Sequence, residues 1–255
     1  MYPQAKSNGA RVCIIGAGMA GLTSAKYLKD EGIDFTVLEC SYYVGGMWRY
    51  EGRLLCDSFE SILHTCCFGD LRLNLPHPAM ELSGYPMPKY MHFFPSAEIY
   101  YYYIQRYAEH FNLMEHIQLL HNVTSVRREG NVWKVIYNKV LNKTDHEEEY
   151  DFIIVGTGHF SNANVPKFPN EELFKAGTSA WDIIIDMLKY AKTVVHSHHS
   201  KQNIKTKFPD RYIRKPDIKE FKENGVVFVD DSYEEIDDVI YCTGKCHFYN
   251  TDNYI

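Results

Sequence analysis

Apolar residues first cluster in a short run at 12–15, which leads directly into a glycine-rich turn and a helix-like stretch at 22–32. A second apolar run, at 34–38, ends on Glu39. A buried strand, a glycine turn, an amphipathic segment and another strand are typical of a βαβ unit. The start of the chain therefore predicts an α/β fold built on a parallel sheet.

Hydrophobic period and turn signals predict further elements. Ser96 is placed to cap a helix at 97–113, whose aromatic stripe is either core or a stacking surface, with core the favoured interpretation. We predict strands at 117–128, 132–138, 150–155, 192–196, 224–229 and 236–242, a charged turn at 142–149 and a helix at 179–190. The proline-rich residues 53–95 form a long irregular excursion, which in a compact domain tends to be functional.

The glycine turn, Gly16-Ala17-Gly18-Met19-Ala20-Gly21, has the spacing of a dinucleotide-binding fingerprint. In that motif Gly16 permits the tight turn, Gly18 lets backbone N–H groups approach a pyrophosphate, and Gly21 lets the helix pack on the strand. The helix N-terminus supplies partial positive charge. An ordinary turn after a strand is the alternative, but the flanking strand, helix and terminal acid all favour a dinucleotide site.

Two further positions bear on that site. Glu39 can accept hydrogen bonds from ribose hydroxyls and would repel a 2′-phosphate, so it indicates FAD or NAD. Gly156-Thr157-Gly158 follows the strand at 150–155 and is either a turn that returns to the cofactor or a plain tight turn. Spacing does not separate these two interpretations.

Composition narrows the class of protein. The 255 residues suffice for one or two domains, and the formal charge of −6 gives no reason to expect nucleic acid. Seven cysteines without a C-x-x-C pair predict core thiols in a reducing, cytoplasmic compartment. No signal-peptide pattern and no apolar run of about 20 residues is found, so we expect no membrane span.

With these elements in order, the chain resembles the flavin-containing monooxygenase family, especially its insect N-oxygenase branch. The resemblance extends from about residue 11 to 244, and several of its motifs are specific to the family when taken together. It is carried by GAGMAG with Glu39, GGMWRY (45–50), LRLNLPHPAM (71–80), GYPMP (84–88), YIQRYAEHFNL (103–113), YDFIIVGTGHFSNANVPKFPN (150–170), SAWDI with VVHSHH (179–199) and ENGVVFVDDSYEEIDDVIYCTG (223–244).

This resemblance implies a fold, two cofactors and a reaction. The fold would be a three-layer, FAD-binding Rossmann-like domain with a second dinucleotide-binding domain. NADPH would reduce the flavin, and one oxygen atom of O₂ would pass to a small molecule with a soft nucleophile, a tertiary amine nitrogen or a sulfide. Whether the chain forms a homo-oligomer is left open.

The resemblance also implies site residues, at the positions of this chain that match the family's motifs. Asn74 would match the family's asparagine beside the isoalloxazine and nicotinamide and is the candidate catalytic residue, although a loop-structuring role before Leu75-Pro76 is the alternative. FAD would contact residues 16–21, Glu39, Met47, Trp48, Leu73, Asn74, Val123, Thr157, Gly158 and Gly244. NADPH would contact Ser179, Ser197 and His198, and a polar strand end is the alternative for the last two.

One departure from the family pattern is large. After Phe168-Pro-Asn170 the chain reaches Gly177 within a few residues, so the F-x-G-x-x-x-H region, a strand and the first glycine of a second fingerprint are absent. We therefore predict an FAD-binding domain from 1–160 with 223–255, and a truncated NADPH-binding domain at 161–222. Whether NADPH still binds is left open by this gap.

Three functions follow from this picture. The leading one is an N- or S-oxygenating flavin monooxygenase, and the alternative is an FAD-binding remnant or regulatory isoform without turnover. A disulfide-type flavin reductase is disfavoured because no C-x-x-C is present. A metal site at His196, His198 and His199 is disfavoured as well, so no metal is expected.

Overall fold

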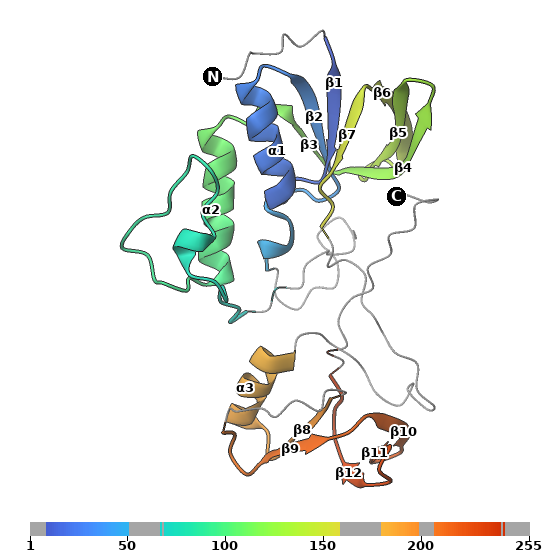
Figure 1. Ribbon diagram of the computed structural model, residues 1–255. Helices are drawn as coiled ribbons and strands as arrows, with labels where there is room; N and C mark the ends of the chain where they lie inside the picture. Colours follow the sequence, from blue (N-terminus) through green and yellow to red (C-terminus); the bar gives the residue numbers. More distant parts are fainter. Residues whose placement is uncertain are drawn as a thin grey trace. The chain divides into compact units, whose positions relative to one another are not determined.

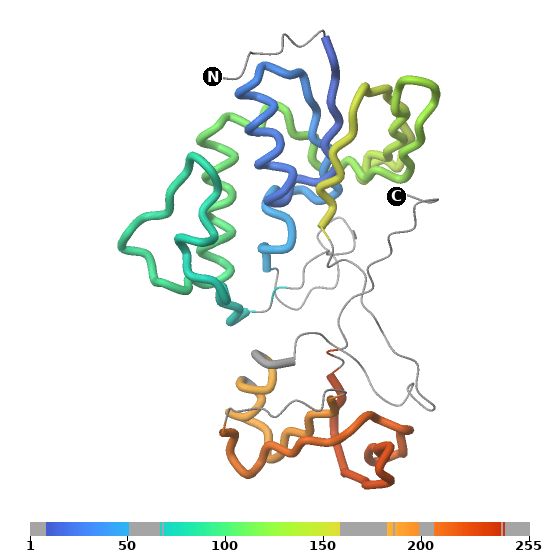
Figure 2. The backbone as a smooth tube through the Cα atoms, viewed as in Figure 1, coloured from blue at the N-terminus to red at the C-terminus, as the bar shows by residue number. Residues whose placement is uncertain are grey.

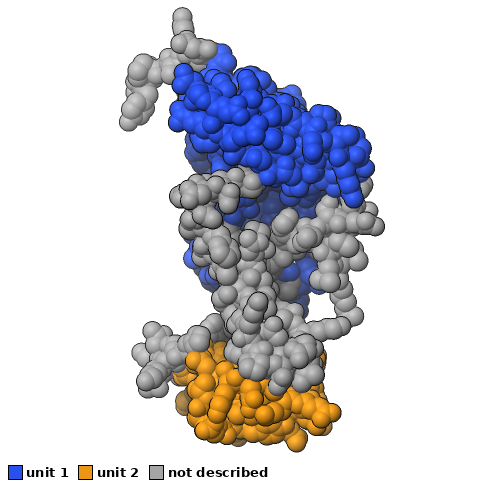
Figure 3. All heavy atoms as spheres, turned by 90° about the vertical axis from the view of Figure 1, so that its right-hand side faces the viewer, with its two compact units in different colours: residues 1–161, 247–255 blue, residues 162–246 orange. Residues whose placement is uncertain are grey.

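This computed structural model describes residues 9–50, 67, 69–158, 180–198, 207–240 and 242. The chain divides into two compact units, residues 1–161 with 247–255 and residues 162–246 (Figure 3). Figure 2 traces the backbone of the chain, coloured from blue at the N-terminus to red at the C-terminus. The two units are considered separately below.

Unit 1 is built on a four-stranded parallel sheet of order β3-β2-β1-β7 (Figure 1). Its strands are β1 (Arg11–Ile15), β2 (Asp34–Glu39), β3 (Ile117–Leu119) and β7 (Phe152–Val155). Helix α1 (Met19–Asp30) connects β1 to β2, which confirms the predicted βαβ unit. The crossover places the end of β1 beside the end of β2, with Ile15 opposite Leu38.

Successive side chains of β1 face opposite sides of this sheet, as the period of a strand requires. Val12 and Ile14 join a buried cluster with α1 and with α2 (Ala97–His110). Cys13 and Ile15 join a second cluster, with Val123, Val135, Tyr137 and Tyr150. The sheet is therefore covered on both faces, and the predicted three-layer arrangement is confirmed.

Helix α2 begins as the sequence predicts, because the Ser96 hydroxyl accepts a hydrogen bond from the Ile99 amide. Its aromatic stripe is only partly core. Tyr103 and Tyr107 are buried, whereas Ile99 is 42% exposed. Short 3₁₀ segments η1 (Gly46–Trp48), η2 (His77–Ala79) and η3 (Met114–His116) flank the helix in sequence.

The layer opposite the helices is an antiparallel sheet of β4 (His121–Glu129), β5 (Val132–Lys139) and β6 (Thr144–Tyr150). The predicted charged turn at 142–149 is therefore wrong from Thr144 onward. Acidic residues disfavour strands in isolation, but β6 pairs along β5 and forms cross-strand ion pairs, such as Lys134 to Glu147 at 3.2 Å. The predicted strand at 117–128 is also interrupted, by Leu120 with φ +60°.

Unit 2 contains α3 (Ala180–Tyr190), a parallel pair of β8 (Val194–Ser197) and β9 (Tyr212–Lys215), and an antiparallel sheet of β10 (Ile218–Lys222), β11 (Gly225–Phe228) and β12 (Tyr233–Glu235). Phe221, Val226 and Phe228 form its buried cluster. The predicted strand at 236–242 is wrong over residues 236–240, which form no strand. Ile236 and Val239 instead pack against this cluster from a loop.

The boundary at residue 161 lies within one residue of the predicted domain boundary. Residues 223–246, however, group with unit 2, because β11 pairs with β10 and β12. Their assignment to the FAD-binding domain stays a prediction. The helices in the described ranges are all too short or too polar to cross a bilayer.

Candidate dinucleotide site

The glycine turn between β1 and α1 is packed as its spacing predicts. Gly16 has φ +97°, which an L side chain rarely adopts, and its amide donates to the Leu38 carbonyl at 2.8 Å. A Cβ on Gly21 would lie 1.8 Å from the Gly16 carbonyl oxygen. The start of α1 can therefore approach the end of β1 only because residue 21 has no side chain.

Gly156 packs against this turn from the neighbouring strand. Its amide donates to the Ile15 carbonyl at 2.8 Å, and a Cβ on Gly16 would lie 2.7 Å from the Gly156 carbonyl oxygen. The parallel pairing of β7 with β1 causes this juxtaposition. Gly156 thus lies against the glycine fingerprint, and a contact of residues 156–158 with a cofactor stays a prediction. Thr157 and Gly158 follow it, both exposed.

Gly18 differs from its neighbours in having room beside it. It is the N-cap of α1 with an ordinary φ of −76°, and no side chain caps the helix there. An added Cβ would meet only the Gly46 Cα, at 3.7 Å. Neither backbone conformation nor packing requires glycine at position 18, whereas a phosphate resting on the N-terminal amides of α1 would require it.

The Glu39 carboxylate is buried at the end of β2 and is held by several donors. Its Oε2 accepts from the Ala17 amide at 2.6 Å, and its Oε1 accepts from the Ser41 amide and hydroxyl at 2.8 and 2.7 Å. Oε1 also lies 3.4 Å from the Cys40 thiol, so the lone pair open to a ribose hydroxyl is on Oε2, which accepts from the Ala17 amide. Glu39 thus lies beside the glycine turn, and its contact with a ribose stays a prediction.

Burial raises the pKa of the neighbouring Cys40 thiol to about 12, with a further contribution from the charge of Glu39. The Cys13 thiol, buried in β1, has a pKa raised to about 12 chiefly by the same desolvation. At neutral pH both stay protonated and unreactive. Cys13 is a core thiol, as the sequence predicts, whereas Cys40 is only partly buried.

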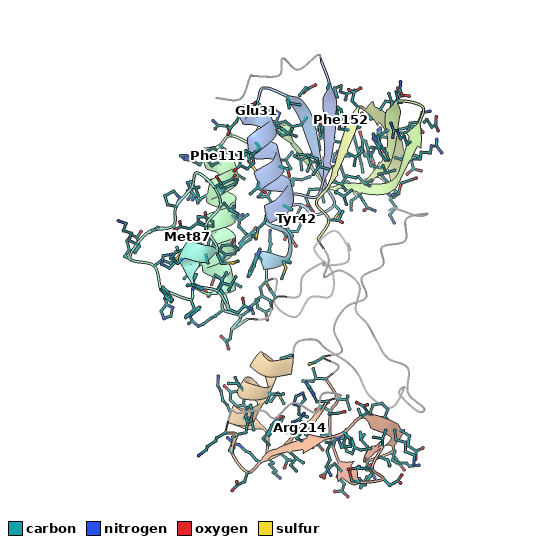
Figure 4. All side chains as sticks on the ribbon, viewed as in Figure 1. Glu31, Tyr42, Met87, Phe111, Phe152 and Arg214 are labelled. Carbon is teal, nitrogen blue, oxygen red and sulfur yellow. The ribbon has the colours of Figure 1, made fainter. Side chains whose placement is uncertain are left out.

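The loop after β2 folds over the start of α1. The Gly45 amide donates to the Ala17 carbonyl at 2.9 Å, and Gly45 has φ +111° with the Tyr101 ring where a Cβ would lie. Trp48 donates its indole N–H to the Met19 sulfur at 3.0 Å. Arg49 follows, its guanidinium over the rings of Tyr42, which Figure 4 labels, and Tyr43.

The segment carrying Asn74 is anchored on both sides. The Leu73 amide donates to the Pro95 carbonyl at 3.0 Å and the His77 amide to the Phe93 carbonyl at 2.8 Å. Leu73 is buried in the cluster shared with α1 and α2, whereas Asn74 is exposed. The fold thus leaves the Asn74 amide accessible on an ordered backbone.

The remaining positions predicted to contact FAD are less informative. Val123 lies in β4 opposite Tyr137, at a register shift before Ser125, with its side chain in the cluster behind the parallel sheet. The Met47 carbonyl accepts from the Cys67 thiol at 2.8 Å. Ala20 is exposed in the first turn of α1. Gly244 lies outside the described residues.

The predicted NADPH positions belong to unit 2. The Ser197 hydroxyl donates to the Pro216 carbonyl at 2.8 Å, and the His198 ring lies 5.1 Å from that of His196. Burial lowers the pKa of His196, which favours its neutral form, and the nearby His198 and Arg214 add to the shift. Ser179, Gly177 and His199 lie outside the described residues. Within the described ranges no three acidic, His or Cys side chains are arranged to hold a metal.

Three features of this site were missed by sequence reasoning. Gly46 opposes Gly18, since its Cβ would lie 3.0 Å from the Gly18 Cα. Ser41 holds Glu39, and Tyr100 contacts both Trp48 and Met19. The paired glycines at 45 and 46 were a visible signal for the first contact, but no local pattern marks the other two.

Taken together, uncapped amides at Gly18, unfilled space beside it and a buried carboxylate across the turn fit the diphosphate and ribose of a dinucleotide. Four of the predicted positions, Gly16, Gly18, Glu39 and Gly156 with its turn, meet at the ends of β1, β2 and β7. This is where ligands bind in open α/β sheets.

Known proteins agree with this geometry. A family model described as flavin-binding monooxygenase-like matches residues 9–180. Senecionine N-oxygenase of Tyria jacobaeae is 34% identical over 96% of this chain and 59% of its own length. S-allyl-L-cysteine S-oxygenase from Allium sativum has a solved structure with 26% identity and a TM-score of 0.79, covering 94% of this chain and 63% of its own.

A solved structure of Tmm from Pelagibacter sp. strain HTCC7211 has a TM-score of 0.84 over 94% of this chain and 62% of its own, at 22% identity, and shows the fold alone. The chain thus spans about three fifths of the length of the relatives it matches. The alignment with the N-oxygenase covers 272 positions, more than the 255 residues here. The relative therefore carries residues within the matched span that this chain lacks, as the gap after Asn170 predicts.

Proposed function

The chain belongs to the flavin-binding monooxygenase-like family, and from this premise we propose that unit 1 binds FAD at the glycine turn. We further propose that the chain uses NADPH and O₂ to oxygenate a small molecule at nitrogen or sulfur. The named oxygenases among its relatives act at these two elements, one on senecionine and one on S-allyl-L-cysteine.

One observation carries the first part of the proposal. Gly18 is a glycine that neither backbone angle nor neighbouring atoms require, at the uncapped start of a 12-residue helix. A bound diphosphate explains it, since the amides of that turn then donate to phosphate oxygens with the support of the helix dipole.

The other residues supply binding and shielding. Glu39 would accept from the ribose hydroxyls of FAD while it orders the Ala17 amide. Trp48 covers the start of α1 from the loop at 45–48 and would help to exclude water. Bound FAD supplies the activation of O₂ and the oxygen transfer, which protein side chains cannot perform.

Asn74 is the proposed catalytic residue. Its exposed amide can donate a hydrogen bond to an oxygen atom at the reacting centre without acting as a strong acid. The anchoring of its backbone through Leu73 and His77 would hold that donor in place. A positioned donor of this kind favours oxygen transfer over release of hydrogen peroxide.

An anaerobic titration with NADPH tests the activity. The purified chain is expected to show an oxidised-flavin band near about 450 nm that bleaches on addition of NADPH, because the nicotinamide reduces bound FAD. A yellow protein that NADPH does not bleach contradicts the monooxygenase, and a chain that takes up no FAD contradicts both parts of the proposal. Dithionite, which reduces any bound flavin, serves as the positive control.

A second candidate is favoured by the internal gap. The senecionine N-oxygenase carries residues within the matched span that this chain lacks, and the sequence resemblance places this gap between Asn170 and Gly177; β8 pairs with β9 in a two-stranded parallel sheet. A truncated nicotinamide site would leave an FAD-binding, non-oxygenating chain. The same titration separates the two, since only dithionite would then bleach the band.

Replacing Asn74 with alanine is expected to leave FAD affinity within about twofold while raising hydrogen peroxide per NADPH consumed on the order of tenfold, because one electrostatic donor is lost while the proposed contacts at the glycine turn and Glu39 remain. Peroxide yield against NADPH consumption is the measurement. Asn122→Ala, at an exposed position on β4, is the matched control and should change neither quantity. Unchanged coupling in Asn74→Ala would remove this residue from the mechanism.

We also propose a reducing, cytoplasmic compartment. Cys13 and Cys40 stand as unbridged thiols in the folded unit, Cys13 buried and Cys40 partly buried. Structural thiols of this kind are usual where disulfides do not form.

A further inference from the structure

Tyr100, on the buried face of α2, lies where three separate segments meet. Its hydroxyl donates to the Met80 carbonyl at 2.9 Å and lies 3.5 Å from the Met19 sulfur. Its ring contacts the indole of Trp48 edge to face, with centroids 4.7 Å apart. The side chain is fully buried, and burial raises the pKa of its hydroxyl well above the usual value, so this proton stays in place at all ordinary pH values.

Each of the three contacts leads to a different part of the candidate site. Met19 is the first residue of α1, directly after Gly18. Trp48 ends the 3₁₀ turn whose Gly46 faces Gly18. Met80 closes the short turn that follows the Asn74 segment.

We propose that Tyr100 is a positioning residue for the flavin site, which holds the start of α1, the loop at 45–48 and the segment at 71–80 in one arrangement. This inference rests on the proposed binding of FAD at the glycine turn. It assigns to α2, which supplies no residue of the fingerprint, the task of fixing the distance between the diphosphate turn and the Asn74 segment.

Two other tyrosines on the buried face of α2 make different contacts from Tyr100. Tyr103, one turn along the same face, accepts from the Leu82 amide at 2.7 Å and donates to the Tyr85 carbonyl, so both its hydrogen bonds stay within the segment at 82–85. The buried Tyr107 hydroxyl has no hydrogen-bond partner in the described part of the chain. Of these three tyrosines, Tyr100 is the one that contacts Met19 and Trp48, while the Tyr101 ring on the same helix lies beside Gly45.

The interaction at Met19 is of an unusual kind. Its sulfur accepts a hydrogen bond from the Trp48 indole N–H at 3.0 Å, and the Tyr100 hydroxyl lies 3.5 Å from the same sulfur atom. Thioether sulfur is a weak acceptor but packs favourably with aromatic rings. A flexible side chain at this variable position of the fingerprint thus becomes the point where loop and helix are joined.

Comparison of Tyr100→Phe with Tyr103→Phe tests the inference. Each variant removes one buried hydroxyl from the same face of α2 and keeps the ring. The measurements are the FAD dissociation constant of the apoprotein, from quenching of flavin fluorescence, and the visible circular dichroism of the bound flavin. Thermal unfolding of each apoprotein reports on stability separately.

Tyr100→Phe is expected to weaken FAD binding about 5- to 10-fold, the equivalent of one lost hydrogen bond, and to change the visible circular dichroism. Tyr103→Phe loses two hydrogen bonds and is expected to lower the unfolding temperature at least as much while FAD affinity stays within about twofold. Met19→Leu, which removes the sulfur but keeps the backbone amide, should shift FAD affinity in the same direction as Tyr100→Phe.

The outcomes separate the inference from the function on which it rests. If the wild-type chain binds FAD and the two tyrosine variants bind it equally well, with unchanged dichroism, Tyr100 has only a structural role and the inference is overturned. If the wild-type chain binds no FAD, the proposed function is contradicted, and the inference about Tyr100 is contradicted with it.

Discussion

Gly21→Ala is expected to prevent unit 1 from folding stably. The added Cβ would lie 1.8 Å from the Gly16 carbonyl oxygen and 3.0 Å from its carbon, and these are backbone atoms that no rotamer change can move. Relief requires α1 to shift away from β1, which opens the cluster of Val12, Ile14 and Leu22. Overpacking of this severity costs at least about 3 kcal/mol, a large part of the total stability of a domain.

Chemical unfolding followed by far-ultraviolet circular dichroism measures this effect. Gly18→Ala is the matched control, because it adds the same methyl group three residues earlier, where the Cβ meets only the Gly46 Cα at 3.7 Å. A stability loss below about 1 kcal/mol is expected there, as for a modest change of helix cap. Equal stability of Gly21→Ala and the wild-type chain would show that α1 does not approach β1 as closely as described.

Gly18→Val is expected to abolish FAD retention while the fold persists. The residue adopts φ −76° and ψ −172°, which a β-branched side chain accepts without strain. Its methyl groups would nevertheless occupy the space in front of the uncapped amides of α1, where the diphosphate is proposed to rest. Affinity for FAD should fall at least about 100-fold, since phosphate contacts and the diphosphate position are lost together.

The readout is the flavin-to-protein absorbance ratio after gel filtration, alongside the unfolding midpoint. Ser24→Val places an equally branched side chain in the second turn of α1, away from the glycine turn, and should keep the flavin. A yellow Gly18→Val protein with wild-type affinity would place the cofactor somewhere other than this turn. A colourless but well-folded protein separates binding from stability, which the Gly21 variant cannot do.

Several features of the fold follow from local sequence, and they share a physical basis. The β1–α1–β2 unit can be predicted from sequence because the strand, turn and helix signals are consecutive and each is strong by itself. The start of α2 is likewise marked by one residue, Ser96, whose hydroxyl caps the next turn. Glu39 is placed by the length of β2, so its position beside the fingerprint needs no tertiary information beyond the crossover.

Other features depend on partners distant in the sequence. Residues 144–150 are acidic and look like a turn, yet they form β6 because β5 supplies backbone partners and cations. Residues 236–240 look like a strand, yet their apolar side chains pack on a small cluster from a loop. In both cases pairing in three dimensions overrides local preference, as β-propensity is mainly a property of context.

By itself, the sequence determined the glycine turn and its acidic partner Glu39, because each is a matter of residue type at a fixed spacing, while the gap after Asn170 follows from the resemblance to the family. Only the tertiary structure decided that Gly156 packs on Gly16, that Gly46 faces Gly18, and that Tyr100 joins the glycine turn to the Asn74 segment. These contacts connect residues dozens of positions apart, and they arise from parallel pairing of β7 with β1 and from the packing of α2, which no local pattern encodes.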